Sequence, residues 1–297
     1  MTGMFEGQSI YEFQDQFGTD DLCTRSLIKL KWGQGYACRN CGYKKYCKTK
    51  RYGDRRCCSC GKVESATAHT LFHKLKFPIH KAFFMLYLIS TTKRGVSSAE
   101  LHRKMGLHKR TCLLFKRKAM EAMGSQQNYK MTGEVEVDET FIGGKDQNSV
   151  GRSKGTKKLV VIGLERNSKG ITKAYARQIE NAGVKQLAPF FQDHIDKNAK
   201  IRTDGWRSYT SLKKKYKNLK QTKSNKGKNF DVLHRFIMGL KSWLRGIHSS
   251  VRDLQAYLDE YVFRFNRHLS KGNIFNILLK RMVNFHPKTY TEIFNVT

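Results

Sequence analysis

The stretch Glu134-Val-Glu-Val-Asp138 alternates polar and apolar residues, which predicts a β-strand with one buried face and an aspartate at its end. A second short strand, Ala199-Lys-Ile-Arg-Thr-Asp204, also ends in an aspartate. If the two strands are neighbours in one sheet, both carboxylates project from the same edge. Such a pair can hold two Mg²⁺ or Mn²⁺ ions, about 3.5–4 Å apart, for in-line phosphoryl transfer. The alternative is that both aspartates are ordinary turn or cap residues.

The segments around these strands predict a mixed α/β domain. The turn Asn167-Ser-Lys-Gly170 separates two further apolar strands, over 158–165 and 171–177. The run 213–228 has eight lysines and no acidic residue, so we expect a loop that binds backbone phosphates. Helical periodicity is found in three segments, 183–196, 230–244 and 251–266. The order β-β-β-α-β-α, with carboxylates at strand ends, predicts an α/β fold of the RNase H-like type.

The chain has 297 residues and is strongly basic, with 57 Lys and Arg against 24 Asp and Glu and a formal charge of +33. The excess is densest in residues 31–133, which contain 23 basic and four acidic side chains. The positive electrostatic field of such a chain favours a polyanionic partner. No apolar run is long enough for a transmembrane helix, and we expect no secretory signal in the polar start of the chain. Neither a P-loop nor a G-x-G-x-x-G motif is present, so no nucleotide cofactor is expected.

Four of the eight cysteines have the spacing of a zinc ribbon. Cys38-Arg-Asn-Cys41 and Cys57-Cys58-Ser-Cys60 are two C-x2-C pairs separated by fifteen residues, and each pair is followed by a glycine. We therefore expect Cys38, Cys41, Cys57 and Cys60 to bind one structural Zn²⁺. Disulfides are the alternative, and they would need an oxidising compartment. The remaining cysteines are Cys23 and Cys112, expected in the core, and Cys47 and Cys58, which are spare.

A helical region follows the ribbon, over residues 77–124. Ser97 and Glu100 have the spacing of a capping box at the start of a short helix, which Gly106 ends. A second helix over 109–123 completes a helix-turn-helix pattern, whose second helix suits the major groove of DNA. An ordinary α-hairpin with a basic outer face is the alternative. The candidate DNA contacts on the second helix are Lys109, Arg110, Lys116, Arg117 and Lys118.

Three longer motifs resemble one family. They are Val137-Asp-Glu-Thr-Phe-Ile-Gly-Gly-Lys145, Thr203-Asp-Gly-Trp-Arg-Ser-Tyr209 and Tyr257-Leu-Asp-Glu-Tyr-Val-Phe-Arg-Phe-Asn-Arg267. Together with the ribbon, they resemble the zinc-ribbon transposases of bacterial insertion sequences, the insertion-sequence 1595 family with an ISXO2-like transposase domain and a DDE-type core. The resemblance implies a metal-dependent DNA phosphoryl transferase that cleaves and joins strands at insertion-sequence ends. It implies Asp138 and Asp204 as the first and second catalytic carboxylates, which bind Mg²⁺ or Mn²⁺.

The third catalytic position departs from the family pattern, in which a glutamate precedes a basic residue by seven positions on one helix face. Here Lys241 supplies the basic residue, and His234 stands in place of the glutamate. Because imidazole is a softer ligand than carboxylate, a histidine at this position predicts a preference for Mn²⁺ over Mg²⁺. Asp231 is the alternative third ligand and Glu260 a weaker one. Glu139 is expected to support Asp138 rather than to replace it.

Other residues near these motifs are candidates for DNA contact. We expect Lys241 and Arg245 to bind phosphates near the scissile bond. Trp206 and Tyr209 either stack on bases or anchor the core. The expected organisation is an N-terminal segment (1–30), a zinc ribbon (31–72), a helix-turn-helix (77–124), an RNase H-like core (133–270) and a C-terminal tail (271–297).

The expected partners are the terminal inverted repeats of the element and its target DNA, bound by a homodimer or a higher oligomer. The expected location is the bacterial cytoplasm, with the nucleoid as the site of action. The alternative function is a DNA-binding protein that no longer cuts, such as a repressor or a decayed transposase. The histidine at position 234 is the one feature that favours this alternative.

Overall fold

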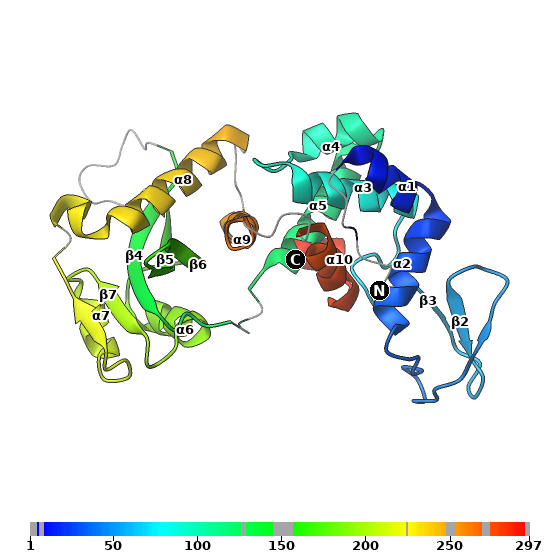
Figure 1. Cartoon of the computed structure of the whole chain (residues 1–297), viewed down its shortest axis with the longest axis horizontal. Coiled ribbons are helices and arrows are strands. Elements are labelled where there is room, and N and C mark those ends of the chain that lie inside the picture. Colours follow the sequence, from blue (N-terminus) through cyan, green and yellow to red (C-terminus); the bar gives the residue numbers. More distant parts are fainter. Residues whose placement is uncertain are drawn as a thin grey trace. The chain divides into compact units, whose positions relative to one another are not determined.

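The structure is a computed structural model in which two compact units are described separately, residues 1–123 with 270–297 and residues 124–269 (Figure 1). The described residues are 5, 9–125, 127, 129–144, 157–223, 225–247, 253–268 and 274–294. Lys145 of the first family motif and the expected helix start at 251–252 lie outside them. Among the described residues, no helix is both long enough and apolar enough to cross a membrane.

The second unit is built on a mixed five-stranded sheet with the strand order β6-β5-β4-β7-β8. The central strand β4 pairs antiparallel with β5 and parallel with β7. This order, with helices on both faces, confirms the predicted α/β fold of the RNase H-like type. The strands are β4 (Glu134–Ile142), β5 (Lys158–Asn167), β6 (Gly170–Ile179), β7 (Lys200–Thr203) and β8 (Leu219–Gln221).

The register brings the two aspartates to the same edge of the sheet. Val137 of β4 lies opposite Thr203 of β7, and this is the last pair between the two strands. Asp138 and Asp204 each follow this pair by one residue, so the two aspartates lie beside each other where the pairing of β4 with β7 stops. The expectation that the two strands are neighbours is therefore correct. Asp204 follows the end of β7, but Asp138 lies inside β4, which continues to Ile142 and stays paired with β5. The expectation that the first strand ends at Asp138 is therefore wrong.

Helices cover both faces of the sheet because successive residues of each strand point to opposite sides. On one face, Val135 and Val161 pack with α6 (Val184–His194) and α7 (Arg207–Leu212). On the other face, Val160 and Ile162 pack with α8 (Asp231–Ile247) and α9 (Leu254–Phe265). The two hydrophobic clusters hold the sheet rigidly at the edge where the aspartates emerge.

The lysine-rich run 213–228 is not a simple loop. It contains the edge strand β8 and most of a 3₁₀ helix, Asn225–Phe230. Leu219 is buried and pairs with Ile201 of β7, which explains why this polar segment joins the sheet. The prediction failed because the single buried leucine is hidden among lysines in the sequence.

The first unit combines helices with a small three-stranded ribbon. Residues 1–30 were expected to be an unassigned segment, but they contain α1 and most of α2. Lys31 at the end of α2 forms a buried ion pair of 2.7 Å with Glu64 of the ribbon. The elements up to residue 91 are α1 (Ile10–Phe17), α2 (Asp20–Trp32), β1 (Tyr46–Lys48), β2 (Asp54–Cys57), β3 (Val63–Ser65) and α3 (Ile79–Thr91).

The predicted pair of helices is present as α4 (Ser98–Met105) and α5 (Lys109–Met123). Ser97 Oγ accepts the backbone N–H of Glu100 over 3.1 Å, and Gly106 is left-handed with φ 64°. These two features begin and end α4 as the sequence predicted. They do not by themselves establish a DNA-binding role for the pair.

Residues 274–294 are not a tail. They form α10 (Ile274–Asn284) and α11 (Tyr290–Phe294), which belong to the first unit although they follow the second in sequence. Arg281 of α10 donates to the carbonyl oxygen of Ala122 at the end of α5 over 3.1 Å. Phe275 is buried and contacts three rings of α1 and α3, those of Phe13, Phe17 and Phe83.

Candidate active site and zinc ribbon

Three carboxylates form a group just beyond the last residue pair between β4 and β7. Asp138, Glu139 and Asp204 each offer one oxygen, and these oxygens all lie within 4.8 Å of one another. Carboxylate oxygens in such a group are the ligands that Mg²⁺ and Mn²⁺ prefer. The chemistry of this donor set therefore fits the divalent metal that the sequence predicted, and the structure adds Glu139 to the expected pair.

Glu139 is fixed from the side of α7. The hydroxyl of Tyr209 donates to Glu139 Oε1 over 2.7 Å, and the backbone N–H of Glu139 donates to Asp138 Oδ1 over 2.8 Å. Burial raises the pKa of Glu139 to about 7, and the nearby charges of Asp138 and Asp204 add to the rise. Burial also raises the pKa of Asp138. A bound cation would lower the pKa of both carboxyl groups, because a nearby positive charge favours the ionised form.

His234 reaches the group from the side of α8. Its Nε2 lies 3.7 Å from Asp138 Oδ2. The neighbouring Leu233 is fully buried in the core, so α8 is held with His234 toward the sheet edge. His234 lies beside the group but does not belong to the three residues whose ligand atoms lie within 4.8 Å of one another.

The two alternative third ligands lie elsewhere. Asp231 is exposed and pairs with Arg235 one turn along α8, over 3.2 Å. Glu260 is fully buried on α9 and accepts two hydrogen bonds from Arg264, of 3.1 and 2.9 Å. Neither belongs to the carboxylate group formed by the described residues.

Lys241 lies two turns beyond His234 on α8 and is partly buried. Burial lowers the pKa of Lys241, and the charges of Arg245 and Lys157 lower it further. Arg245 itself is exposed, and its Nε donates to the carbonyl oxygen of Lys241 over 3.4 Å. Three cations close to one another form a natural site for a phosphate, because an anion would relieve their mutual repulsion.

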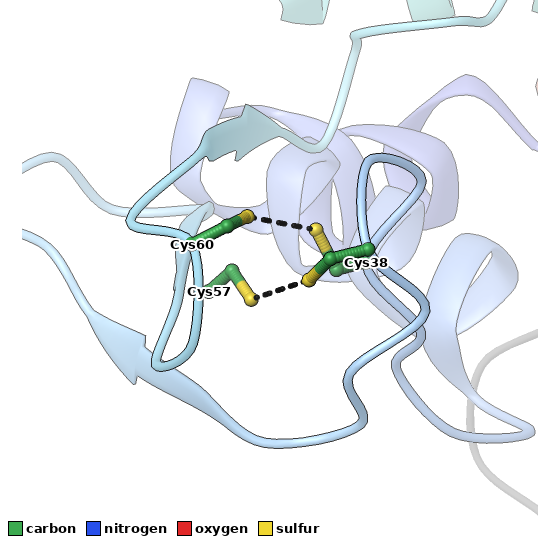
Figure 2. A group of neighbouring side chains, drawn as sticks. Cys38, Cys57 and Cys60 are labelled. Carbon is green, nitrogen blue, oxygen red and sulfur yellow. Dashed lines mark hydrogen bonds between the residues drawn. The ribbon is translucent and has the colours of Figure 1, made fainter.

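Four cysteines converge between the two knuckles of the ribbon. The sulfurs of Cys38 and Cys60 are 3.6 Å apart (Figure 2). Those of Cys41 and Cys57 are also 3.6 Å apart. Zn–S bonds of about 2.3 Å in a tetrahedron place sulfurs about 3.8 Å apart, so this group fits Zn²⁺. Gly42 and Gly61 have φ angles of 74° and 68°, as the tight knuckles require.

Comparison with known families identifies the second unit. Residues 130–266 match the family described as the ISXO2-like transposase domain. This segment is similar to an ISXO2-like transposase domain. The match spans all five strands of the sheet and the helices α6 to α9, and it includes every residue of the carboxylate group.

Solved structures and curated proteins add little to this assignment. The structure titled "Crystal structure of a pre-cleavage Mos1 transpososome" is similar with 10% identity and a TM-score of 0.28, over 69% of this chain and 78% of that chain. The "Crystal structure of the Mos1 Strand Transfer Complex" is similar with 12% identity and a TM-score of 0.29, over 70% and 78%. No curated protein matches the chain.

Two aromatic residues beside the carboxylate group have different roles. Tyr209 is fully buried against Phe191, so it is a core anchor that also holds Glu139. Trp206 is 49% exposed, and its Nε1 donates to the carbonyl oxygen of Ala182 over 2.9 Å. Of these two residues, only Trp206 therefore exposes its ring to a ligand near the three carboxylates.

The expected DNA contacts on α5, outside the transposase domain, are only partly available. Lys109 and Arg110 are exposed at the start of the helix. Lys116 and Arg117 are only 2% and 6% exposed, so the expectation that they face DNA is wrong for this structure. Arg117 lies under the ring of Phe294, 5.8 Å from its centre, because α11 covers this part of α5. Lys118 is partly buried.

Proposed function

We propose that this protein is a DNA transposase that cleaves insertion-sequence ends and joins them to target DNA. The observation that carries the proposal is the group of Asp138, Glu139 and Asp204 at the sheet edge, inside a transposase domain. Bound Mg²⁺ or Mn²⁺ would activate the attacking hydroxyl and stabilise the leaving oxygen. The protein's own contribution is to hold hard oxygen ligands in a fixed geometry before DNA arrives.

Each residue then has a defined role in this proposal. Asp138 and Asp204 are the metal-binding catalytic carboxylates, and His234 completes the set with a ring nitrogen. Lys241 and Arg245 bind phosphates next to the scissile bond as fixed cations. The net charge of +33 draws DNA to the protein and supports non-specific contact along the duplex.

The wider setting of the reaction follows from the same chemistry. The partners are the terminal inverted repeats of the element and a target duplex, and two ends must be paired, so we propose at least a dimer. The zinc ribbon is a structural module with a basic surface. The bacterial cytoplasm, where the nucleoid is found, is the proposed site of action.

The test is cleavage and strand transfer on DNA that carries the element's own ends, in Mg²⁺ and in Mn²⁺. The intact protein should nick and join at the ends, faster in Mn²⁺, and Asp138→Ala should abolish both steps. His234→Ala should reduce the rate by at least about tenfold, on the order of the loss of one positioned ligand. Asp231→Ala is the matched control, because it changes an exposed residue of the same helix.

A second function has one observation in its favour, the histidine in place of the family's glutamate. It is a DNA-binding repressor or a decayed transposase that no longer cuts. If the intact protein binds the ends but cuts in neither metal, this second function replaces the first. If His234→Ala retains full activity while Asp138→Ala has none, the third ligand is another residue.

A further inference from the structure

A second pair of cysteines lies in the ribbon, outside the four zinc-binding sulfurs. Cys47 is in β1, and Cys58 directly follows β2. Both are exposed, and their sulfurs are 2.7 Å apart. The backbone N–H of Cys58 donates to the carbonyl oxygen of Lys45 over 3.3 Å, so the strand pairing itself holds the two thiols together.

This sulfur separation differs from that of the zinc ligands. The four zinc-binding cysteines have neighbouring sulfurs 3.6 Å apart, close to the edge of a tetrahedron around Zn²⁺. A separation of 2.7 Å is too short for two ligands of one zinc ion and approaches the bonded distance of about 2.05 Å. The geometry therefore favours a bond between Cys47 and Cys58 over a shared metal.

We propose that Cys47 and Cys58 are a reversible disulfide site next to the zinc centre. The oxidant is a small disulfide of the glutathione type. One cysteine sulfur attacks the small disulfide and releases one small thiol, which leaves a mixed disulfide. The second cysteine sulfur then attacks the protein side of that mixed disulfide and releases the other small thiol. The two cysteines are oxidised, the small disulfide is reduced, and the two cysteine protons are taken up by the two released thiols.

The cross-link would affect the ribbon without using a zinc ligand. It ties β1 to the knuckle that carries Cys57 and Cys60. When zinc leaves, the reduced ribbon keeps only backbone pairing between β1 and this knuckle, whereas the oxidised ribbon keeps a covalent link as well. We therefore expect zinc to be released several-fold more slowly to a chelator from the oxidised protein than from the reduced protein.

The experiment uses the zinc-loaded full chain treated with oxidised glutathione. Intact mass should fall by two hydrogens per chain, and peptide mapping should find Cys47 joined to Cys58, with zinc content unchanged. Cys47→Ser should instead keep one glutathione on Cys58. Cys112→Ser, which changes a buried cysteine outside the ribbon, should behave like the unsubstituted protein.

Two results would overturn the proposal. One is a stable glutathione adduct on the unsubstituted protein without a Cys47–Cys58 cross-link. The other is a cross-link between zinc-binding cysteines with loss of zinc. Mapping of the unsubstituted protein decides between these results even if a variant folds poorly. The outcome is also independent of whether the protein cleaves DNA.

Discussion

The hydroxyl of Tyr209 on α7 donates a hydrogen bond of 2.7 Å to Glu139 on β4. Burial and the charge of Glu139 raise the pKa of Tyr209 well above its ordinary value, so the hydroxyl remains protonated as a donor. A residue of the hydrophobic core is thereby connected directly to the group of carboxylates. The position of Glu139 depends on the packing of α7 as well as on its own strand.

Tyr209→Phe should weaken divalent metal binding about fivefold, because it removes one hydrogen bond of about 1 kcal/mol and keeps the ring in the core. The measurement is a Mn²⁺ titration followed by electron paramagnetic resonance. Tyr216→Phe is the control, since Tyr216 is also buried and packs on Phe191 but lies outside the carboxylate group. An equal loss in both variants would mean that the effect comes from packing.

Zinc removal should unfold the ribbon. Its strands are three or four residues long, and a structural zinc site of this kind contributes directly to folding free energy. Chelation should lower the thermal midpoint of the first unit, and Cys57→Ser should bind no zinc at purification. Cys112→Ala should retain the metal. Full zinc content in Cys57→Ser, measured by elemental analysis, would exclude the assignment of four cysteine ligands.

Stability should fall in mild acid because of His194. Its ring stacks on Tyr175 at 4.2 Å, and burial lowers the pKa of His194 from 6.5 to about 4. In the unfolded chain, His194 therefore binds a proton below about pH 6.5. In the folded chain, His194 stays neutral until the pH falls to about 4. Stability present above pH 6.5 is lost through this window, by up to about 3 kcal/mol. The free energy of unfolding, measured with denaturant at several pH values between 6.5 and 4, should change less with pH in His194→Phe than in the unsubstituted protein. The same slope in both proteins would mean that other groups cause the acid sensitivity.

The first residue and the middle of α5 should respond differently to substitution. Lys109→Ala should weaken DNA binding and reduce the slope of log affinity against log salt by about one, because an exposed lysine releases one counterion. Lys116→Met should leave the salt slope unchanged, since its side chain is buried. Fluorescence anisotropy of labelled DNA over a series of salt concentrations measures the affinity and its salt dependence for both variants. A loss of slope in Lys116→Met would show that α11 moves away from α5 when DNA binds.

Features with a local signature were predicted correctly. The alternation in 134–138 identified β4, and the two C-x2-C pairs identified the group of four sulfurs. Asp138 and Asp204 do come together, and His234 Nε2 lies 3.7 Å from Asp138 Oδ2. The roles of these three residues in metal binding and catalysis stay predictions. These predictions depend on the periodicity and spacing of residues that lie close together in the sequence.

Glu139 was expected to support Asp138 and not to join the group of metal ligands, and the alternation of a strand would place adjacent side chains on opposite faces. That rule fails here for a physical reason. Asp138 and Glu139 lie beyond the last pair between β4 and β7, so that neighbouring strand no longer separates the two faces. Side chains from both faces can then meet at Asp204. The available signal was an acidic residue directly after the first aspartate.

The sequence by itself determined most strands and helices of the second unit, the convergence of four cysteines and the resemblance to the transposase family, because each resides in short patterns. Only the tertiary structure decided that residues 274–294 complete the first unit, that Lys116 and Arg117 are buried and that Tyr209 holds Glu139. Each of these joins residues far apart in the chain. Such contacts depend on which surfaces remain to be buried once the local elements have formed, and no local pattern encodes that choice.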